Sequence, residues 1–197
     1  MPDRDQGPAP KKWELLDDRL LNACRVWDLR ARRYHHPIRG EVDNEFYYID
    51  SRDWVIVVAR TPADELVLIR QFRCGSNALS WELPGGIIDA GEDPVVAGLR
   101  ELCEETGYSA PSGRYIGSCR PNPAILNNQC HFVFADRVKP DAAGVNWDDH
   151  EEIEVRLLPE KNVFDWVREQ TIEHALALTG LFYYRVFQEK MDISPDS

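Results

Sequence analysis

The chain has 197 residues, with 34 acidic side chains against 23 Lys and Arg, so its formal net charge is −11. This length predicts a single domain, or one domain with a small addition, and a content of 43% hydrophobic residues excludes a disordered chain. The acidic balance argues against non-specific binding to nucleic acid, which needs a basic surface. Because no run of about 18 apolar residues occurs, we expect no membrane-spanning helix.

The cysteines and the N-terminal residues give an expectation for the cellular compartment of the protein. The number of cysteines is odd and no two have CxxC spacing, which argues against a disulfide framework and a zinc knuckle; they are Cys24, Cys74, Cys103, Cys119 and Cys130. The first twelve residues lack the apolar core of a signal peptide. We therefore expect reduced thiols in a cytoplasmic protein.

The N-terminal quarter predicts a loose tail at residues 1–12 and a small β-subdomain at residues 13–52. Apolar and charged residues alternate between Cys24 and Tyr34, as in a half-buried strand. A second strand is expected at residues 45–50.

The main domain is expected at residues 53–191, before a short C-terminal tail at residues 192–197. Its predicted strands are residues 54–59, 66–73, 114–119, 131–138 and 152–158, with a loop between 73 and 92 and C-terminal helices around 163–167 and over 171–190. Asp93 can cap a helix that begins at Pro94, and Gly107 can end it. This order of strands and helices predicts an α+β or α/β sandwich.

The predicted helix carries three carboxylates on one face. Glu101, Glu104 and Glu105 fall within an arc of about 100°, where like charges repel. A bound divalent cation would turn this repulsion into a site, and hard oxygen ligands suit Mg²⁺ or Mn²⁺. Arg100 lies one turn before Glu104 and can orient it. The alternative is a solvated acidic face, which is the usual role of an isolated Glu-Glu pair.

The spacing around this helix is much more specific than the pair. Gly86, five residues, Glu92, seven residues, Arg100-Glu101, two residues, Glu104-Glu105, one residue, Gly107 and Tyr108 match the signature of the Nudix hydrolases. Seven fixed residues at ordinary frequencies give a chance match on the order of one in ten million. The sequence therefore resembles a Nudix hydrolase.

The resemblance implies an α/β/α sandwich with a mixed sheet between helices. It further implies a loop–helix–loop that binds Mg²⁺ through Glu101, Glu104, Glu105 and the carbonyl of Gly85, with Glu92 orienting the loop. The implied reaction is hydrolysis of a nucleoside diphosphate linked to another group.

Three further segments resemble the branch that hydrolyses ADP-ribose and nucleotide sugars. Arg70-Gln71-Phe72-Arg73 resembles a motif whose last Arg grips the diphosphate, with an edge-strand charge pair as the alternative for these arginines. Glu82, in Trp81-Glu82-Leu83-Pro84-Gly85-Gly86, resembles a Glu that can contribute to the metal site. Pro123 lies close to a proline that marks ADP-ribose enzymes, although a lone Pro is equally a loop residue.

One departure weakens the assignment to ADP-ribose. Asn127 and Asn128 stand where such enzymes often carry an acidic pair, which leaves room for another nucleoside diphosphate sugar. A second enzymatic hypothesis is a diadenosine polyphosphate or coenzyme A pyrophosphatase, and a third hypothesis is a non-catalytic nucleotide sensor with the Nudix fold. A sensor usually loses the glutamates of the signature, which are all present here.

The resemblance also implies a general base in the acidic loop before the last strand. Glu151 is the expected base and Glu152 is next, while a solvated charge run is the alternative. His150 and His131 are further candidates, although a lone histidine is more often structural.

The aromatic N-terminal strands predict an interface. Trp27 and Phe46 are candidates for stacking on the substrate base, and core packing is the alternative role. Strands of this branch exchange between two subunits, so we expect a homodimer whose partner contributes to the base pocket. The alternative is a small sheet folded back on its own domain.

Overall fold

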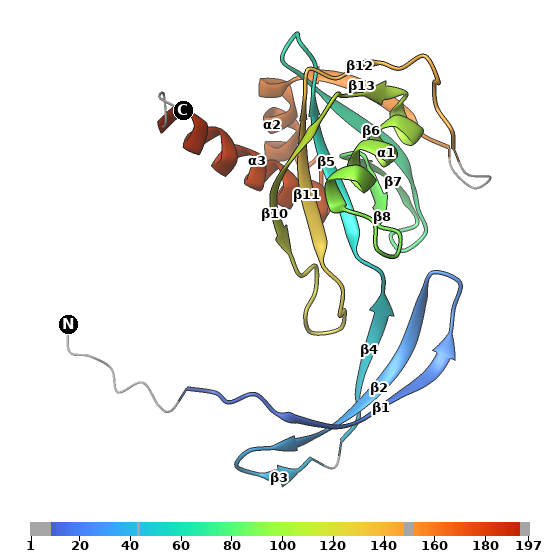
Figure 1. Cartoon of the computed structure of the whole chain (residues 1–197), viewed down its shortest axis with the longest axis vertical. Coiled ribbons are helices and arrows are strands. Elements are labelled where there is room, and N and C mark those ends of the chain that lie inside the picture. The colour runs from blue at the N-terminus through green and yellow to red at the C-terminus, as the bar shows by residue number, and fades with distance from the viewer. Residues whose placement is uncertain (1–8, 43, 148–151, 194–197) are drawn as a thin grey trace, which may run out of the picture. The chain divides into compact units, whose positions relative to one another are not determined.

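The computed structural model describes residues 9–42, 44–147 and 152–193, and the chain divides into two compact units (Figure 1). The first unit comprises Met1–Ser51 with Asn122–Asn127, and the second comprises Arg52–Pro121 with Asn128–Ser197. The division after Ser51 lies one residue from the expected boundary. The segment Asn122–Asn127, expected in the main domain, belongs instead to the first unit.

The first unit is an antiparallel sheet in which β2 pairs with each of the other strands. Its strands are β1 (Glu14–Ala23), β2 (Trp27–His36), β3 (Gly40–Glu41) and β4 (Phe46–Ser51). The segment Asn122–Asn127 joins this sheet at β4, where the amide of Ile49 donates to the carbonyl of Ile125 at 2.8 Å. The side chain of Asn127 adds a hydrogen bond to the amide of Ser51.

The strand β1 was not expected from the sequence. Two bulges interrupt its pairing with β2, one between Leu15 and Asp17 and one between Leu20 and Asn22. Each bulge adds a residue and breaks the alternation of apolar and polar side chains by which a strand is recognised.

The second unit is built on a seven-stranded mixed sheet with the order β10-β11-β5-β6-β13 (Figure 1). These strands are β10 (Gly113–Cys119), β11 (Cys130–Asp136), β5 (Trp54–Arg60), β6 (Glu65–Arg73) and β13 (Glu154–Pro159); β7 (Ala78–Glu82) pairs with β6 and β8 (Gly85–Ile87) pairs with β5. Among the described strands of this sheet, only β11 and β5 are parallel. The short strands β9 (Tyr108–Ser109) and β12 (Lys139–Pro140) form a separate pair.

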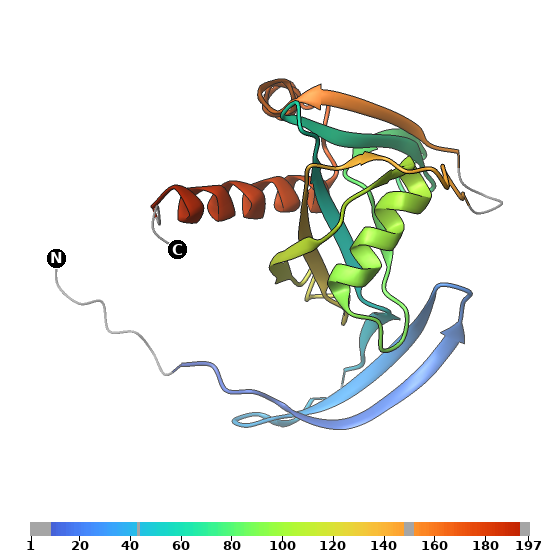
Figure 2. The same cartoon turned by 45° about the horizontal axis from the view of Figure 1, so that its top comes forward.

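Helices cover both faces of this sheet (Figure 2). The helix α1 (Pro94–Thr106) packs on the face that carries Val55 and Val57 of β5. The helices α2 (Glu160–Arg168) and α3 (Ala175–Ile193) pack on the other face, which carries Ile56 and Val58. Side chains therefore alternate between two cores along β5, and this layered arrangement confirms the predicted α+β sandwich with a mixed sheet.

Two expectations for the second unit are wrong. The loop expected between residues 73 and 92 contains β7 and β8, which pair with β6 and β5. These strands are only five and three residues long, too short for a recognisable alternation of apolar and polar side chains. The last helix begins at Ala175 rather than at Thr171, after a left-handed Gln170. In the described part of the chain, no helix combines the length and the apolar character that crossing a membrane requires.

Candidate active site on the loop and helix around Arg100

The ends of α1 are fixed as the sequence predicts. The carboxylate of Asp93 accepts hydrogen bonds from the amides of Val95 and Val96, and Pro94 occupies the first turn. Gly107 ends the helix in the left-handed conformation, with φ of 67°, and its amide donates to the carbonyl of Cys103. The acidic residues of α1 therefore have a defined helical register.

Three glycines allow this helix and the strand β8 to approach their neighbours closely. A Cβ atom on Gly86 would lie 2.4–2.6 Å from the carboxylate atoms of Glu101, and one on Gly85 would lie 2.1 Å from the carbonyl oxygen of Val55. A Cβ atom on Gly98 would lie 3.1 Å from the side chains of Val55 and Val57. The glycine in the middle of α1 thus serves the packing of the helix on the sheet, despite its low helix propensity.

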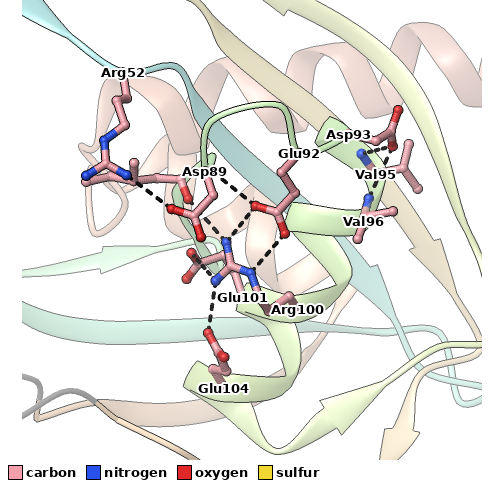
Figure 3. A network of polar contacts seen from close by, with 10 residues as sticks. Arg52, Asp89, Glu92, Asp93, Val95, Val96, Arg100, Glu101 and Glu104 are labelled. Carbon is pink, nitrogen blue, oxygen red and sulfur yellow. Dashed lines mark hydrogen bonds and ion pairs between the residues drawn. The ribbon is translucent and has the colours of Figure 1, made fainter.

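Arg100 joins the acidic side chains of the site (Figure 3). Its guanidinium donates two hydrogen bonds of 3.0 Å to Glu92, one of 2.8 Å to Glu101 and one of 3.0 Å to Glu104. A further bond reaches the carbonyl oxygen of Ile87. Glu92 also accepts from the amide of Asp89, so it ties the loop to the helix.

The charges in this cluster stabilise one another. The hydrogen bonds from Arg100 lower the pKa of Glu92 below its ordinary value, although burial acts in the opposite direction. The pKa of Arg100 is raised, first by its bonds to Glu92 and then by those to Glu101 and Glu104. One guanidinium therefore compensates three carboxylates, which would otherwise repel each other.

Glu105 faces a different neighbour. Its side chain lies in a buried position, and Oε2 accepts a hydrogen bond of 2.8 Å from the amide of Gly85. Glu101 and Glu105 therefore flank β8, one beside Gly86 and the other beside Gly85. The helix face does bring Glu101 and Glu104 together on Arg100, whereas Glu105 is turned toward the backbone of β8.

Sequence reasoning missed the segment that closes the C-terminal end of α1. The indole of Trp147 donates to the carbonyl oxygen of Glu105 at 2.9 Å, and the amide of Asn146 donates to that of Glu104 at 2.9 Å. The amide of Asp141 donates to Gly107 at 2.7 Å. These bonds satisfy carbonyl groups at the helix end, and no feature of the sequence signals a contact about forty residues away.

Arg73 and Glu82 form a two-pronged ion pair. The Nε and Nη2 atoms of Arg73 donate to the two carboxylate oxygens of Glu82 at 2.9 and 2.7 Å. Burial alone raises the pKa of Glu82, but the bonds and charge of Arg73 outweigh it and lower the pKa. The bonds to Glu82 raise the pKa of Arg73, although burial acts in the opposite direction. The pair lies near the acidic helix because Gly85, three residues after Glu82, donates its amide to Glu105.

Arg70 lies three residues before Arg73 on β6, so the two side chains point to opposite faces of the sheet. It pairs with Glu154 of β13 at 2.5 Å, and its guanidinium lies 5.1 Å from the centre of the Trp81 ring. The structure therefore pairs both arginines of the Arg-Gln-Phe-Arg segment with glutamates, and β6 lies inside the sheet instead of at its edge. Arg73 remains beside the acidic helix, whereas Arg70 pairs with the neighbouring strand.

The remaining predicted residues belong to other parts of the described chain or lie outside it. Trp27, Phe46 and Pro123 belong to the first unit and are exposed there. Of the candidates for the general base, Glu151 and His150 lie outside the described residues, and Glu152 is exposed. His131 contacts the hydroxyl of Tyr115 at 3.1 Å and the carboxylate of Asp53 at 3.5 Å.

The donor set suits a hard divalent cation. The groups are carboxylate oxygens, and the missing Cβ of Gly86 leaves the space that the carboxylate of Glu101 fills. Within residues 9–42, 44–147 and 152–193, no three acidic, histidine or cysteine side chains are gathered closely enough to hold a metal ion as they stand. In the cluster, the carboxylates of Glu101 and Glu104 both accept hydrogen bonds from Arg100.

The arrangement defines a class of protein: a mixed sheet between helices with a carboxylate-lined loop–helix on one face. The family model described as NUDIX domain matches residues 50–177. A CMP-5'-(N-acetyl-N-hydroxy-3-aminopropyl)phosphonate hydrolase from Streptomyces rubellomurinus is 30% identical over 148 residues, which cover 75% of this chain and 70% of that protein. The ADP-ribose pyrophosphatase of Bacillus subtilis is 26% identical over 132 residues, which cover 67% and 71% of the two chains.

A solved structure agrees with this result at the level of the fold. The crystal structure of an ADP compounds hydrolase superposes with a TM-score of 0.79 at 21% identity, covering 94% of this chain and 98% of the other. The chain belongs to the Nudix hydrolase family, whose members generally need a divalent metal.

Proposed function

We propose that the chain is a metal-dependent pyrophosphatase that splits a nucleoside diphosphate sugar into a nucleoside monophosphate and a sugar phosphate. ADP-ribose is the leading candidate substrate. The observation that carries the proposal is the position of Arg73, a half-exposed guanidinium bound to Glu82, which lies three residues before the Gly85 amide that donates to Glu105. In a protein with a net charge of −11, this cation is a local group suited to a diphosphate.

Each residue of the site has a proposed role. Glu101, Glu104 and Glu105, with the carbonyl of Gly85, would hold Mg²⁺, or Mn²⁺ in its place. A cation bound there supplies charge neutralisation at the diphosphate and lowers the pKa of a coordinated water. Arg100 holds the carboxylates of the helix in register.

Arg73 would bind the diphosphate through its planar fork, and Glu151 would accept the proton of the attacking water. Glu82 was expected to contribute to the metal site. Its two bonds to Arg73 support a different role, which is to hold the guanidinium in the substrate-free protein.

The relatives support this chemical class and leave the substrate open. One is named for ADP-ribose and another for a phosphonate linked to CMP, so both the base and the second group vary among similar proteins. Asn127 bonds to the backbone and to Asp50 within the first unit, and Asn128 bonds to the carbonyl of Arg52. These contacts support a structural role for the two asparagines.

The N-terminal sheet supports the proposal of a homodimer. Leu16, Leu20, Trp27, Phe46 and Tyr47 are all at least 41% exposed, which is unusual for large apolar side chains within one small sheet. We propose that a second copy of the chain covers them and that Trp27 or Phe46 stacks on the substrate base. Pro123 belongs to the same unit and is the third proposed contact.

The test is phosphate release from a panel of nucleotide sugars, diadenosine polyphosphates and coenzyme A, coupled to a phosphatase that attacks only the phosphomonoester products. The expected result is release from nucleotide sugars in Mg²⁺ and loss of release in a folded Glu105→Gln variant. Binding of a nucleotide without release would identify a sensor. Equal release by both proteins would refute the assigned site.

A further inference from the structure

His174 is a partly buried histidine, 25% exposed, that the proposed reaction does not use. It precedes α3, and its backbone carbonyl accepts a hydrogen bond from Leu178 that fixes the start of this helix. Its Nδ1 atom is buried and has no hydrogen-bond partner among the described residues. The carboxylate of Glu82 is close to it, with Oε2 3.7 Å from Nδ1.

The buried carboxylate of Glu82 requires a hydrogen-bond donor both with and without substrate. Its side chain is only 1% exposed, and in this structure Arg73 binds both of its oxygens. A buried carboxylate that loses its partner bears the full desolvation cost of an unpaired charge. Arg73 itself is 44% exposed, so it has access to a ligand in the solvent.

The same guanidinium therefore has two acceptors, Glu82 in the substrate-free protein and the diphosphate in the complex. If the Nε and Nη2 atoms of the guanidinium turn to a diphosphate, Glu82 loses the donors that it now uses. We propose that His174 is a positioning residue that takes over Glu82 when Arg73 engages the substrate. A small rotation of the imidazole would bring Nδ1–H within hydrogen-bond distance of Oε2. This inference rests on the proposed function.

The electrostatic setting agrees with this role. Burial lowers the pKa of His174, the charge of Glu82 acts in the opposite direction, and the charge of Arg73 lowers it further. A neutral imidazole still donates one N–H. His174 can thus stabilise Glu82 without adding a second full positive charge beside Arg73.

The first test does not depend on activity. Urea and thermal unfolding would be measured for Arg73→Met, His174→Leu and the double variant, with His174→Asn as the matched control because its amide places a donor near the position of Nδ1. In the presence of Arg73, His174→Leu is expected to lower the Tm by less than about 2 °C, whereas in the Arg73→Met protein it lowers the Tm by about 5 °C or more. His174→Asn should keep most of the stability in both proteins.

Additive effects of the two substitutions would overturn the proposal, since they would show that Glu82 does not use His174 when Arg73 is lost. Equal losses for Asn and Leu would also overturn it, because packing alone would then explain the histidine. If Arg73→Met does not fold, Arg73→Lys takes its place in the cycle, since a single amine cannot make the two parallel bonds.

The second test is kinetic and uses the full chain with the nucleotide sugar that the panel identifies. His174→Leu is expected to raise KM by about five- to tenfold with kcat changed by less than about twofold, and His174→Asn should stay within about twofold of the unchanged protein in both constants. An unchanged KM in His174→Leu would refute the proposal that His174 replaces Arg73 as the partner of Glu82. If the unchanged protein hydrolyses no substrate of the panel, the proposed function fails, and the unfolding cycle still decides the role of His174.

Discussion

Replacing Arg100 with Met removes the one cation that three carboxylates share, and it keeps most of the aliphatic stem. The guanidinium makes four bonds to acidic oxygens, two to Glu92, one to Glu101 and one to Glu104. Arg100→Met is therefore expected to destabilise the fold through charge repulsion, with little loss of packing.

The magnitude follows from the exposure of each partner. The side chains of Glu92 and Glu101 are 16% and 15% exposed, whereas that of Glu104 is 38% exposed. A sheltered bond to a charged group contributes about 1.5–3 kcal/mol, and an exposed ion pair about 0–1 kcal/mol. Because Arg100 is itself about one-third exposed, solvent reduces the sum, and we expect a loss of about 2–3 kcal/mol, or roughly 4–12 °C in Tm.

The assay is thermal unfolding of the substrate-free protein with and without Mg²⁺ at matched ionic strength. The control is Arg52→Met, because Arg52 makes one exposed ion pair with Asp89 in the same region (Figure 3) and should change stability by less than about 0.5 kcal/mol. Mg²⁺ should recover part of the loss in Arg100→Met. An unchanged Tm in that variant, or an equal loss in the control, would refute the reasoning.

The same variant has a defined dependence on pH. The folded-state pKa of Glu92 is depressed by Arg100, so its contribution to stability is present above the unfolded value near 4.3 and is lost as the pH falls through the folded value. The difference in Tm between the two proteins should therefore shrink below about pH 4. A constant difference from pH 7 to pH 3 would contradict this linkage.

Four further outcomes follow from the proposed site. Glu105→Gln should lower kcat by several orders of magnitude while the protein stays folded by circular dichroism, because electrostatic terms of this kind are worth several kcal/mol. Glu151→Gln should lower kcat by about 10²- to 10⁴-fold with little change in KM, and a change in KM alone would assign it to binding. Arg73→Lys should lose activity although it keeps its charge, since kcat/KM depends on the two parallel bonds of a guanidinium. Deletion of residues 1–50 should abolish dimerisation and activity together, and light scattering that gives about 23 kDa for the fully active intact chain would refute the shared site.

The helix of the site was predictable because every signal for it is local. The cap at Asp93, the stop at Gly107 and the spacing of the glutamates all lie within one turn or two of the residues that they affect. The buried strand β5 was equally predictable, since a continuous apolar run of this length is typical of a strand that is buried on both faces. Local rules and the fold agree at these positions.

The ion pair between Arg73 and Glu82 was not predictable by the same means. It depends on β7, a strand that pairs with β6 in a stretch expected to be a loop. The sequence motif suggested a separate role for each residue, one at the diphosphate and one at the metal. Only the pairing of β6 with β7 shows that the carboxylate of Glu82 binds the guanidinium of Arg73.

The contacts of Arg100 bear on the order in which the site is assembled. Three carboxylates on one loop and helix would oppose folding at neutral pH if no cation were present, because like charges at this spacing repel one another. The guanidinium supplies that charge within the chain, so the loop and helix can fold before any metal ion binds. Binding of a divalent cation then competes with Arg100 for Glu101 and Glu104 instead of creating the site. This predicts that Arg100→Met, although less stable, binds Mg²⁺ more tightly than the unchanged protein in isothermal titration calorimetry without substrate. Weaker binding by the folded variant would show that Arg100 organises the carboxylates for the metal and does not compete with it.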